Sequence, residues 1–241
     1  MRTPASLLLP ALVLLLSVAT ACRDGGPSGP TSDVVSTIPW QASESLTYAL
    51  KDRGGKSLGQ GRLSVAVSGS ETVLSQLYQS DTSSDQIQVR VDSRTLKPIS
   101  STRQIKTARD EETVEVTYTE EGALIRQGDK QSGLGVPEHA YDNDSSLFLW
   151  RTIDFAAVLD VGFPLRYVTI VTNRRSRQTV ELRVVGRETV RVPAGELSAW
   201  RLEIRTSNAN QTAWYASDLP TRPLLRYDND RGTIFELQKL P

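Results

Sequence analysis

Residues 180–204 read VELRVVGRETVRVPAGELSAWRLEI, and this stretch predicts the fold. Apolar side chains take every second position toward both of its ends, at Val180, Leu182, Val184, Trp200, Leu202 and Ile204. A period of two is typical of a strand with one buried and one solvated face. Pro193-Ala194-Gly195 predicts a tight turn between them, because proline lacks an N–H for a strand ladder and glycine tolerates positive φ. The stretch therefore predicts two antiparallel strands joined by a turn.

The same period of two recurs along the chain after residue 40. The alternating sets are Leu46, Tyr48 and Leu50; Leu63, Val65 and Val67; Ile87, Val89 and Val91; Val114, Val116 and Tyr118; and Thr233, Phe235 and Leu237. Turn-forming residues separate the sets at 52–55, 68–70, 121–122 and 228–232. Because short connections favour hairpins, we expect a mainly β fold, all-β or α+β in class. Its architecture would be one large curved antiparallel sheet or a half-open barrel.

One segment departs from this period. Residues 142–146 are Asp, Asn and Ser, which cap helix N-termini, and Leu147, Trp150 and Ile153 follow at a spacing of three. We expect one short helix from about Ser145 to Phe155, which would plug one end of the curved sheet. A buried strand is the alternative, since a short apolar run fits both structures.

The N-terminus has the order of a secretory signal peptide. A positive charge at Arg2 precedes an uncharged apolar run over residues 7–16, and small residues follow up to Ala21. The apolar run is shorter than the ~20 residues of a membrane-spanning helix. We therefore expect residues 1–21 to be an export signal that is removed.

Cys22, the only cysteine, follows directly. The four residues Ala19-Thr20-Ala21-Cys22 resemble the lipobox of bacterial lipoproteins, with Ala19 where that pattern usually has leucine. The resemblance implies that Cys22 is lipidated and anchors the mature chain to a membrane. A lone exported cysteine has no disulfide partner, and a free thiol is reactive, which favours lipid attachment. The alternative is cleavage by ordinary signal peptidase at Ala-x-Ala, which would leave an unmodified thiol.

The remaining chain divides into a tether and one domain. Residues 23–33 contain no large apolar side chain, so they cannot bury enough surface to fold alone. We expect residues 22–39 to be the lipidated cysteine and a flexible tether, and residues 40–241 to be a single β-rich domain. By resemblance to Gram-negative lipoproteins, Arg23 lacks the inner-membrane retention signal. This implies the periplasmic face of the outer membrane, if the host is Gram-negative.

The charge balance argues against nucleic acid as a partner. The chain has 28 basic and 28 acidic residues, and loss of the signal peptide removes only Arg2. Such a near-neutral chain has no broad positive field to attract nucleic acid. The one compact basic run, Arg174-Arg175-Ser176-Arg177, lies between two strand-like runs and predicts a hairpin tip. Such a tip is typically a solvated loop, and contact with phosphate head groups or acidic glycans is the alternative.

The sequence predicts no catalytic residue, no metal site and no cofactor. His139 is the only histidine, no Gly-x-Ser-x-Gly elbow holds a serine, and one histidine with one cysteine cannot form a zinc set. The oxygen-rich runs at 142–144 and 228–230 lack the full calcium-loop pattern. They predict a helix cap and a hairpin turn instead.

The C-terminal half resembles a known family. The resemblance rests on Gly186-x-Glu188-x-Val190-x-Val192-Pro193-Ala194-Gly195, on Trp214-Tyr215, and on Leu224-Leu225-Arg226-Tyr227. These residues are similar to a core motif of a bacterial envelope family of unknown function, whose members are strand-rich exported or lipid-anchored proteins. The resemblance covers roughly residues 140–240 and implies a plan similar to the half-barrels of lipoprotein carriers. We expect Trp200 and Trp214 to be buried in the core.

Two functional hypotheses follow. The first is a non-enzymatic envelope lipoprotein that binds a lipid or another apolar ligand on the concave face of its curved sheet. The alternative is a structural or protein-interaction lipoprotein of the cell envelope. Both have the membrane as a partner through the N-terminal lipid, and the second adds an envelope protein.

Overall fold

A computed structural model of the protein describes residues 26–40 and 43–240. Its strands form one sheet of fifteen in the order β8-β7-β6-β5-β4-β3-β2-β1-β15-β14-β13-β12-β11-β10-β9. The strands are β1 (Glu44–Lys51), β2 (Ser57–Ser68), β3 (Glu71–Gln79), β4 (Ser83–Asp92), β5 (Pro98–Thr107), β6 (Glu111–Thr119), β7 (Gly122–Gln127), β8 (Lys130–Leu134), β9 (Ala140–Asp142), β10 (Leu165–Val171), β11 (Ser176–Val192), β12 (Gly195–Arg205), β13 (Asn210–Ala216), β14 (Leu224–Asp228) and β15 (Ile234–Leu237). Neighbours pair antiparallel except β9 and β10, which pair parallel.

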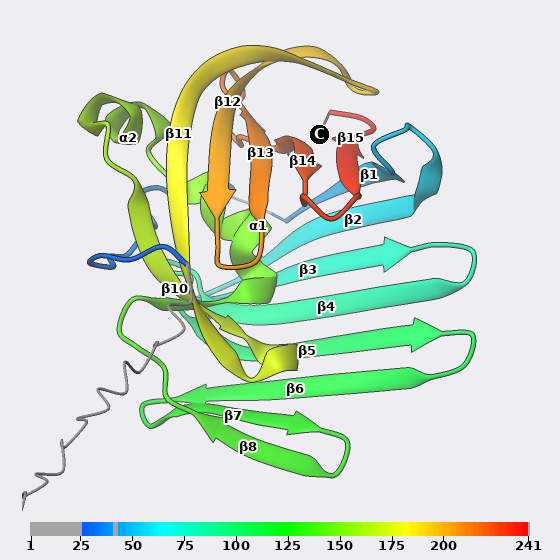
Figure 1. Ribbon diagram of the computed structural model, residues 1–241, viewed down its shortest axis with the longest axis vertical. Helices are drawn as coiled ribbons and strands as arrows, with labels where there is room; N and C mark the ends of the chain where they lie inside the picture. The colour runs from blue at the N-terminus through cyan, green and yellow to red at the C-terminus, as the bar shows by residue number, and fades with distance from the viewer. Residues whose placement is uncertain (1–25, 41–42, 241) are drawn as a thin grey trace, which may run out of the picture.

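The sheet curls around a helical segment without closing. Figure 1 shows strands β2 to β8 as one curved layer and β10 to β13 as a second wall, with α1 (Ser146–Leu149) between them. Within the described chain, β8 and β9 stand at the two ends of the strand order and are not paired with each other. The predicted half-open sheet is therefore confirmed. The predicted turn at Pro193-Ala194-Gly195 joins β11 to β12, with Val192 opposite Gly195.

The helical segment begins where the sequence predicts and then divides in two. A 3-10 turn η1 (Asn143–Ser145), α1 and a second 3-10 turn η2 (Trp150–Thr152) follow one another. Ile153 is extended, with φ −67° and ψ 141°, and ends this run before Phe155. A second helix, α2 (Phe155–Val161), starts with the Asp154 carboxylate accepting a hydrogen bond from the Ala157 amide. The prediction of one continuous helix to Phe155 was wrong, because Asp154 caps a new helix rather than extending the first.

The helical segment fills the concave side as a plug. Leu147, Phe148, Leu149 and Trp150 are all buried there. The Tyr215 hydroxyl donates to the Leu147 carbonyl at 2.8 Å, so the plug is bonded to strand β13. Burial of these side chains supplies the main stabilisation of the segment, because a helix of four residues has little stability of its own.

One of the two tryptophans expected in the core lies elsewhere. Trp200 is buried, and its ring stacks on Phe155 at a centroid distance of 5.9 Å. Trp214 is half-buried on the outer face of the sheet, where its indole N–H donates to Glu188. Its neighbours in β13, Ala213 and Tyr215, take the inward positions. Since successive side chains on a strand point to opposite faces, Trp214 has to face outward.

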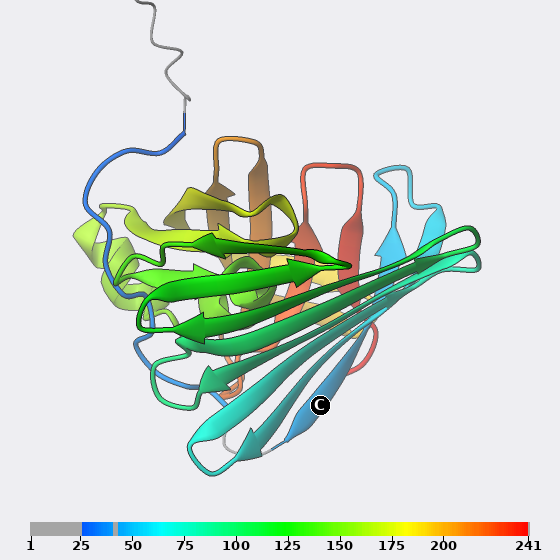
Figure 2. The ribbon, with the colours of Figure 1, turned by 90° about the horizontal axis from the view of Figure 1, so that it is seen from below.

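The described part of the predicted tether, residues 26–39, is packed against the domain from Ser32 onward. The Ser32 amide donates to the Arg166 carbonyl at 2.8 Å and the Thr37 amide to the Thr152 carbonyl at 3.0 Å. Val34 and Trp40 are buried, so their apolar surface holds this stretch in place. The expected boundary at residue 39 was therefore wrong, and Figure 2 shows this N-terminal stretch running along the body of the molecule.

The signal peptide predicted at residues 1–21 and the lipidation predicted at Cys22 lie outside the described residues. Over the part of the chain that is described, no helix is both long enough and apolar enough to cross a membrane.

Candidate functional site

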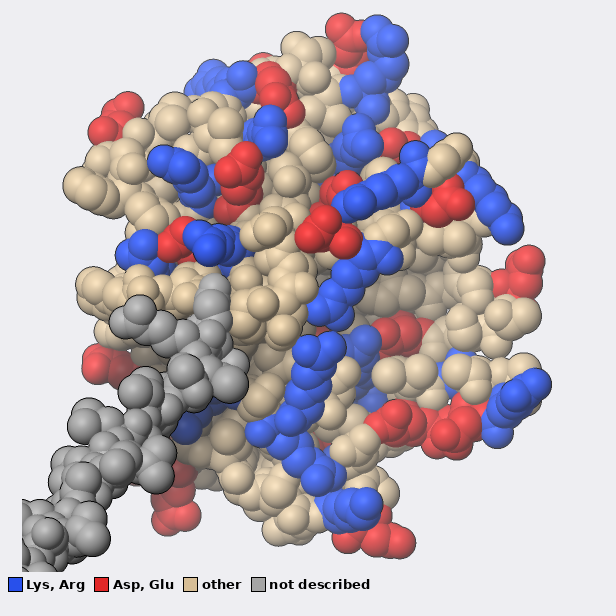
Figure 3. Space-filling view, viewed as in Figure 1, with Lys and Arg blue, Asp and Glu red and all other residues tan. Residues whose placement is uncertain are grey.

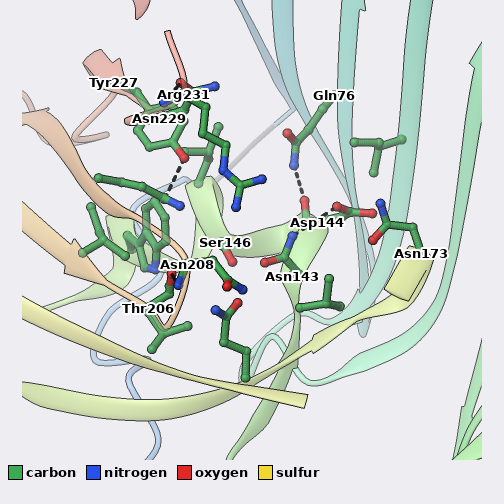
Figure 4. A pocket seen from close by; sticks show the side chains of 18 of the residues that line it. Gln76, Asn143, Asp144, Ser146, Asn173, Thr206, Asn208, Tyr227, Asn229 and Arg231 are labelled. Atoms are coloured by element: carbon green, nitrogen blue, oxygen red, sulfur yellow. Dashed lines mark hydrogen bonds between the residues drawn. The ribbon is translucent and has the colours of Figure 1, made fainter. Parts of the chain in front are cut away.

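A cavity of about 330 Å³ opens on the concave side of the sheet beside the helical plug. Strands β3 to β5, the plug, the β10–β11 tip, the β12–β13 hairpin and the β14–β15 turn all contribute to its walls. Figure 4 shows Asn143, Asp144 and Ser146 of the plug at its centre, with Arg231 on one side and Asn173 on the other. In Figure 3 this face is hollowed near its middle, and basic side chains gather beside the hollow. The curl of the sheet thus brings distant segments together around one small volume.

Aromatic rings form part of the cavity wall. Trp150 and Tyr227 lie with their ring centroids 6.2 Å apart. The Trp150 indole N–H donates to the Tyr167 hydroxyl at 2.9 Å, and the Tyr227 hydroxyl donates to the Gln211 side-chain carbonyl at 2.7 Å. These bonds fix both rings, so the aromatic part of the wall is preformed.

Amide side chains make up much of the remaining wall. The cavity is lined by Gln76, Asn143, Asn173, Gln178, Asn208, Gln211 and Asn229. Gln76 is held from both sides, because it donates to the Asp144 carbonyl and accepts from the Tyr78 hydroxyl. Among the described residues, the side chains of Asn173 and Asn208 make no hydrogen bond within the protein. The walls are therefore more polar than the apolar concave face that the sequence predicted.

The polar run at 142–144 is the cap of the plug. The Asp142 carboxylate accepts from the Asp144 amide at 2.8 Å and from the Tyr118 hydroxyl at 2.6 Å, and it is fully buried. The predicted helix cap is therefore confirmed. Within the described residues, no group of three or more His, Cys, Asp or Glu side chains is placed to hold a metal ion.

Asp144 is the acidic side chain of the cavity wall. It is 7% exposed and pairs with Arg103, whose guanidinium also binds Asp85 at 2.6 Å. Burial raises the pKa of Asp144 to about 7, and the neighbouring charge of Asp142 adds to the rise, while Arg103 opposes it. Burial raises the pKa of Asp142 as well. Each of the two carboxyls therefore disfavours ionisation of the other, and Asp144 holds a proton more readily than an exposed aspartate does.

Two further arginines line the cavity without an acidic partner. Arg174 and Arg231 both belong to the wall, and no carboxylate of the described chain lies within 4.0 Å of either guanidinium. Arg231 belongs to the predicted turn at 228–232, in which the Asn229 side chain accepts from the Arg231 and Thr233 amides. The predicted hairpin turn is thus confirmed, and it also places a cation beside the cavity.

The basic tip that the sequence singled out is more than a solvated loop. It lies between β10 and β11 as predicted, with the 3-10 turn η3 (Thr172–Arg174) at its apex. Arg174 and Arg177 are both exposed, but of these two only Arg174 lines the cavity. Arg175 donates to the Gln127 side chain of β7 at 3.0 Å. The curl of the sheet brings the tip against strands that lie far from it in the pairing order.

His139 does not belong to the cavity wall. Its Nδ1 lies 3.4 Å from the Asp33 carboxylate, which also pairs with Lys97. The histidine therefore belongs to the contact between the N-terminal stretch and the domain.

The sequence patterns did not single out two residues of the cavity wall, Gln76 and Arg103, and they gave Tyr227 only as part of the family motif. Gln76 left a usable signal, because it occupies an inward position between Leu74 and Tyr78 on a strand. A polar residue at a position predicted to be buried needs a partner inside the fold, which marks it as part of a polar site.

Comparison with known proteins shows the family. A family model described as "Protein of unknown function (DUF3108)" matches residues 45–233. The predicted resemblance to a strand-rich family of unknown function is thereby confirmed. No curated protein matches the chain.

Solved structures share the fold. A crystal structure of a β-barrel-like protein of the domain of unknown function DUF1849, from Brucella abortus, matches with a TM-score of 0.53 and 10% identity. The match covers 85% of this chain and 98% of that chain. A protein with a YmcC-like fold from Bacteroides fragilis matches with a TM-score of 0.31 and 12% identity, over 86% of this chain and 99% of that one. The first likeness shows the fold alone, and the second is too weak to support an argument.

Proposed function

The chain belongs to the DUF3108 family of proteins of unknown function, and we propose that it is a lipid-anchored, non-enzymatic binding protein of the cell envelope. Its ligand would be a small molecule held in the cavity on the concave side of the open sheet. The observation that carries the proposal is the cavity of about 330 Å³, with aromatic and amide side chains on its walls. Preformed concave sites of this size and mixed composition are typical of small-molecule binding.

The polarity of the walls favours a polar ligand over a hydrocarbon chain. Asn173, Asn208 and Arg231 line the cavity, and a hydrocarbon would remove water from them without replacing its hydrogen bonds. Burial of polar groups without partners is costly. A ligand with its own hydrogen-bonding groups would satisfy these side chains instead.

Anchoring at Cys22 would keep the domain beside the membrane. Ser32 is bonded to the domain, because its amide donates to the Arg166 carbonyl at 2.8 Å. Nine residues separate Cys22 from Ser32, and an extended chain spans at most about 3.3–3.6 Å per residue. This connection would reach at most about 36 Å, so the domain would act close to the bilayer surface.

Lipid labelling tests the anchor. A labelled fatty acid supplied to expressing cells should mark the wild-type chain and leave a Cys22→Ala variant unmarked. Arg23→Gln, which changes the next residue and keeps the thiol, serves as the control and should be labelled. An unlabelled wild type would show that Cys22 carries no lipid.

Native mass spectrometry of the mature chain, purified gently from an envelope, tests the cavity. The wild type should carry a reproducible added mass. An Asn208→Trp variant should lose it, because the indole would fill the space beside the β12–β13 hairpin. Asn210→Trp is the matched control, since Asn210 is exposed, lies two residues away and does not line the cavity. A bare wild-type mass, or a ligand that survives Asn208→Trp, would count against a binding role for this cavity.

A further inference from the structure

We propose that the ligand is an acidic sugar, a hydroxylated ring that carries a carboxylate or a phosphate. This inference rests on the proposed binding function and names the ligand class for the same cavity. Three independent features of the wall lead to it: unpaired positive charge, free amide groups and an aromatic face.

The charge of the wall favours an anion. Arg103 is paired with Asp85 and Asp144, whereas Arg174 and Arg231, both exposed, have no carboxylate partner within 4.0 Å among the described residues. The two unpaired guanidiniums come from different hairpins and line the same cavity. Guanidiniums bind carboxylates and phosphates through charge-assisted hydrogen bonds, and their charge has a greater effect inside a cleft than on an open surface.

The amides of the wall favour hydroxyl groups. An amide side chain both donates and accepts, as a hydroxyl does, so each can pair with the other in either direction. The side chains of Asn173 and Asn208 make no hydrogen bond within the described protein, and the side-chain nitrogen of Gln211 is also free, since only its oxygen is bonded. Asn173 lies at the β10–β11 tip and the other two in the β12–β13 hairpin, which suits a ligand with hydroxyls on more than one of its edges.

The aromatic part of the wall favours a ring. Tyr227 is half-buried and anchored through its hydroxyl to Gln211, and Trp150 lies against it. An aromatic side chain offers a flat apolar surface, on which the C–H face of a sugar ring would pack while its hydroxyls turn to the amides. A simple anion such as inorganic phosphate would use the arginines and leave this face and the amides unused.

Isothermal titration calorimetry on the full mature chain tests the inference. The probes are galacturonic acid and glucose 1-phosphate, the neutral sugars galactose and glucose, and inorganic phosphate. At least one acidic sugar should bind ten or more times more tightly than its neutral counterpart and than phosphate. Arg231→Gln and Arg174→Gln should each weaken the acidic sugar at least fivefold, and affinity should fall as salt rises. Arg177→Gln is the matched control, because Arg177 belongs to the same tip outside the cavity, and it should change affinity less than twofold.

Several outcomes would overturn the acidic-sugar inference. Equal affinity for acidic and neutral sugars would show that the arginines do not recognise an acidic group. Equal affinity for an acidic sugar and for inorganic phosphate would show that the sugar ring is not recognised. An effect of Arg177→Gln as large as that of Arg231→Gln would indicate a diffuse surface field instead of a site. If no sugar binds while Asn208→Trp still abolishes the added mass in native spectra, the ligand class is wrong and the proposed binding function stands. If that added mass survives Asn208→Trp, the binding function itself fails.

Discussion

Replacement of Asp144 by asparagine should change how stability depends on pH. Asp144 is buried in the cavity wall beside Asp142, and burial raises its pKa from an ordinary value of 3.8 to about 7. An acid whose pKa is higher in the folded state holds its proton more tightly there than in the unfolded chain. The folded state is therefore favoured at low pH, and this contribution is lost as the pH rises from about 4 to about 7.

The expected magnitude follows from the rise in pKa. Each pKa unit corresponds to about 1.36 kcal/mol, so a rise from 3.8 to about 7 costs the wild type about 4 kcal/mol across that window. Asparagine does not titrate, and it retains the size of the side chain. The free energy of unfolding of Asp144→Asn, relative to the wild type, should therefore increase by about 4 kcal/mol from pH 4 to pH 7.

Urea unfolding followed by tryptophan fluorescence at pH 4, 5, 6 and 7 measures this difference. Asp92→Asn is the control. Hydrogen bonds from Thr95 lower the pKa of Asp92 below its ordinary value of 3.8, so its ionised form stabilises the fold and this contribution changes only below about pH 4. The difference between Asp92→Asn and the wild type should therefore stay nearly constant from pH 4 to pH 7. If the difference between Asp144→Asn and the wild type stays flat from pH 4 to pH 7, or falls, the buried carboxyl has no raised pKa and the reasoning fails.

Two further substitutions test the packing. Arg151→Leu should lower the free energy of unfolding by about 3–5 kcal/mol, because it leaves the half-buried Glu44 carboxylate and the Thr221 and Arg222 carbonyls without the buried guanidinium that they bind. Adding Glu44→Gln should recover part of that loss, and a double variant as unstable as the sum of the two single variants would argue against the pair. Gly59→Ala should destabilise by more than about 1 kcal/mol, since Gly59 has φ +134° and an added Cβ would clash with the Gln79 carbonyl oxygen. Gly133→Ala, where the added Cβ has no neighbour within 4 Å, should cost far less when both variants are compared by urea unfolding.

The strands could be predicted because successive side chains of a strand face opposite sides of the sheet, so buried and exposed residues alternate in the sequence. Leu46, Tyr48 and Leu50 were expected to face inward, and all three are buried. The turn at Pro193-Ala194-Gly195 was equally local, since its backbone geometry depends on the residues themselves. The helix cap at Asp142 was visible for the same reason.

The position of Trp214 could not be predicted from the residue type alone. Its size and apolarity suggested the core, but the register of β13 gives the inward positions to its neighbours Ala213 and Tyr215. The N-terminal stretch is a second case. Val34 and Trp40 are buried because they pack against the folded domain. In both cases the deciding factor is a partner that lies far away in the sequence.

The sequence by itself determined the β class, the turns and the cap of the plug, because each depends on residues within a few positions of one another. It also determined the family resemblance, through short motifs that can be recognised without knowing how they pack. Only the tertiary structure decided the cavity. Gln76, Arg174 and Arg231 are separated by long stretches of chain and share one wall because the sheet curls around the plug. The amount of curl depends on strand register, twist and packing summed over the whole sheet. No short segment contains that information, and so neither the polarity of the cavity nor its unpaired charge could be predicted from the residues alone.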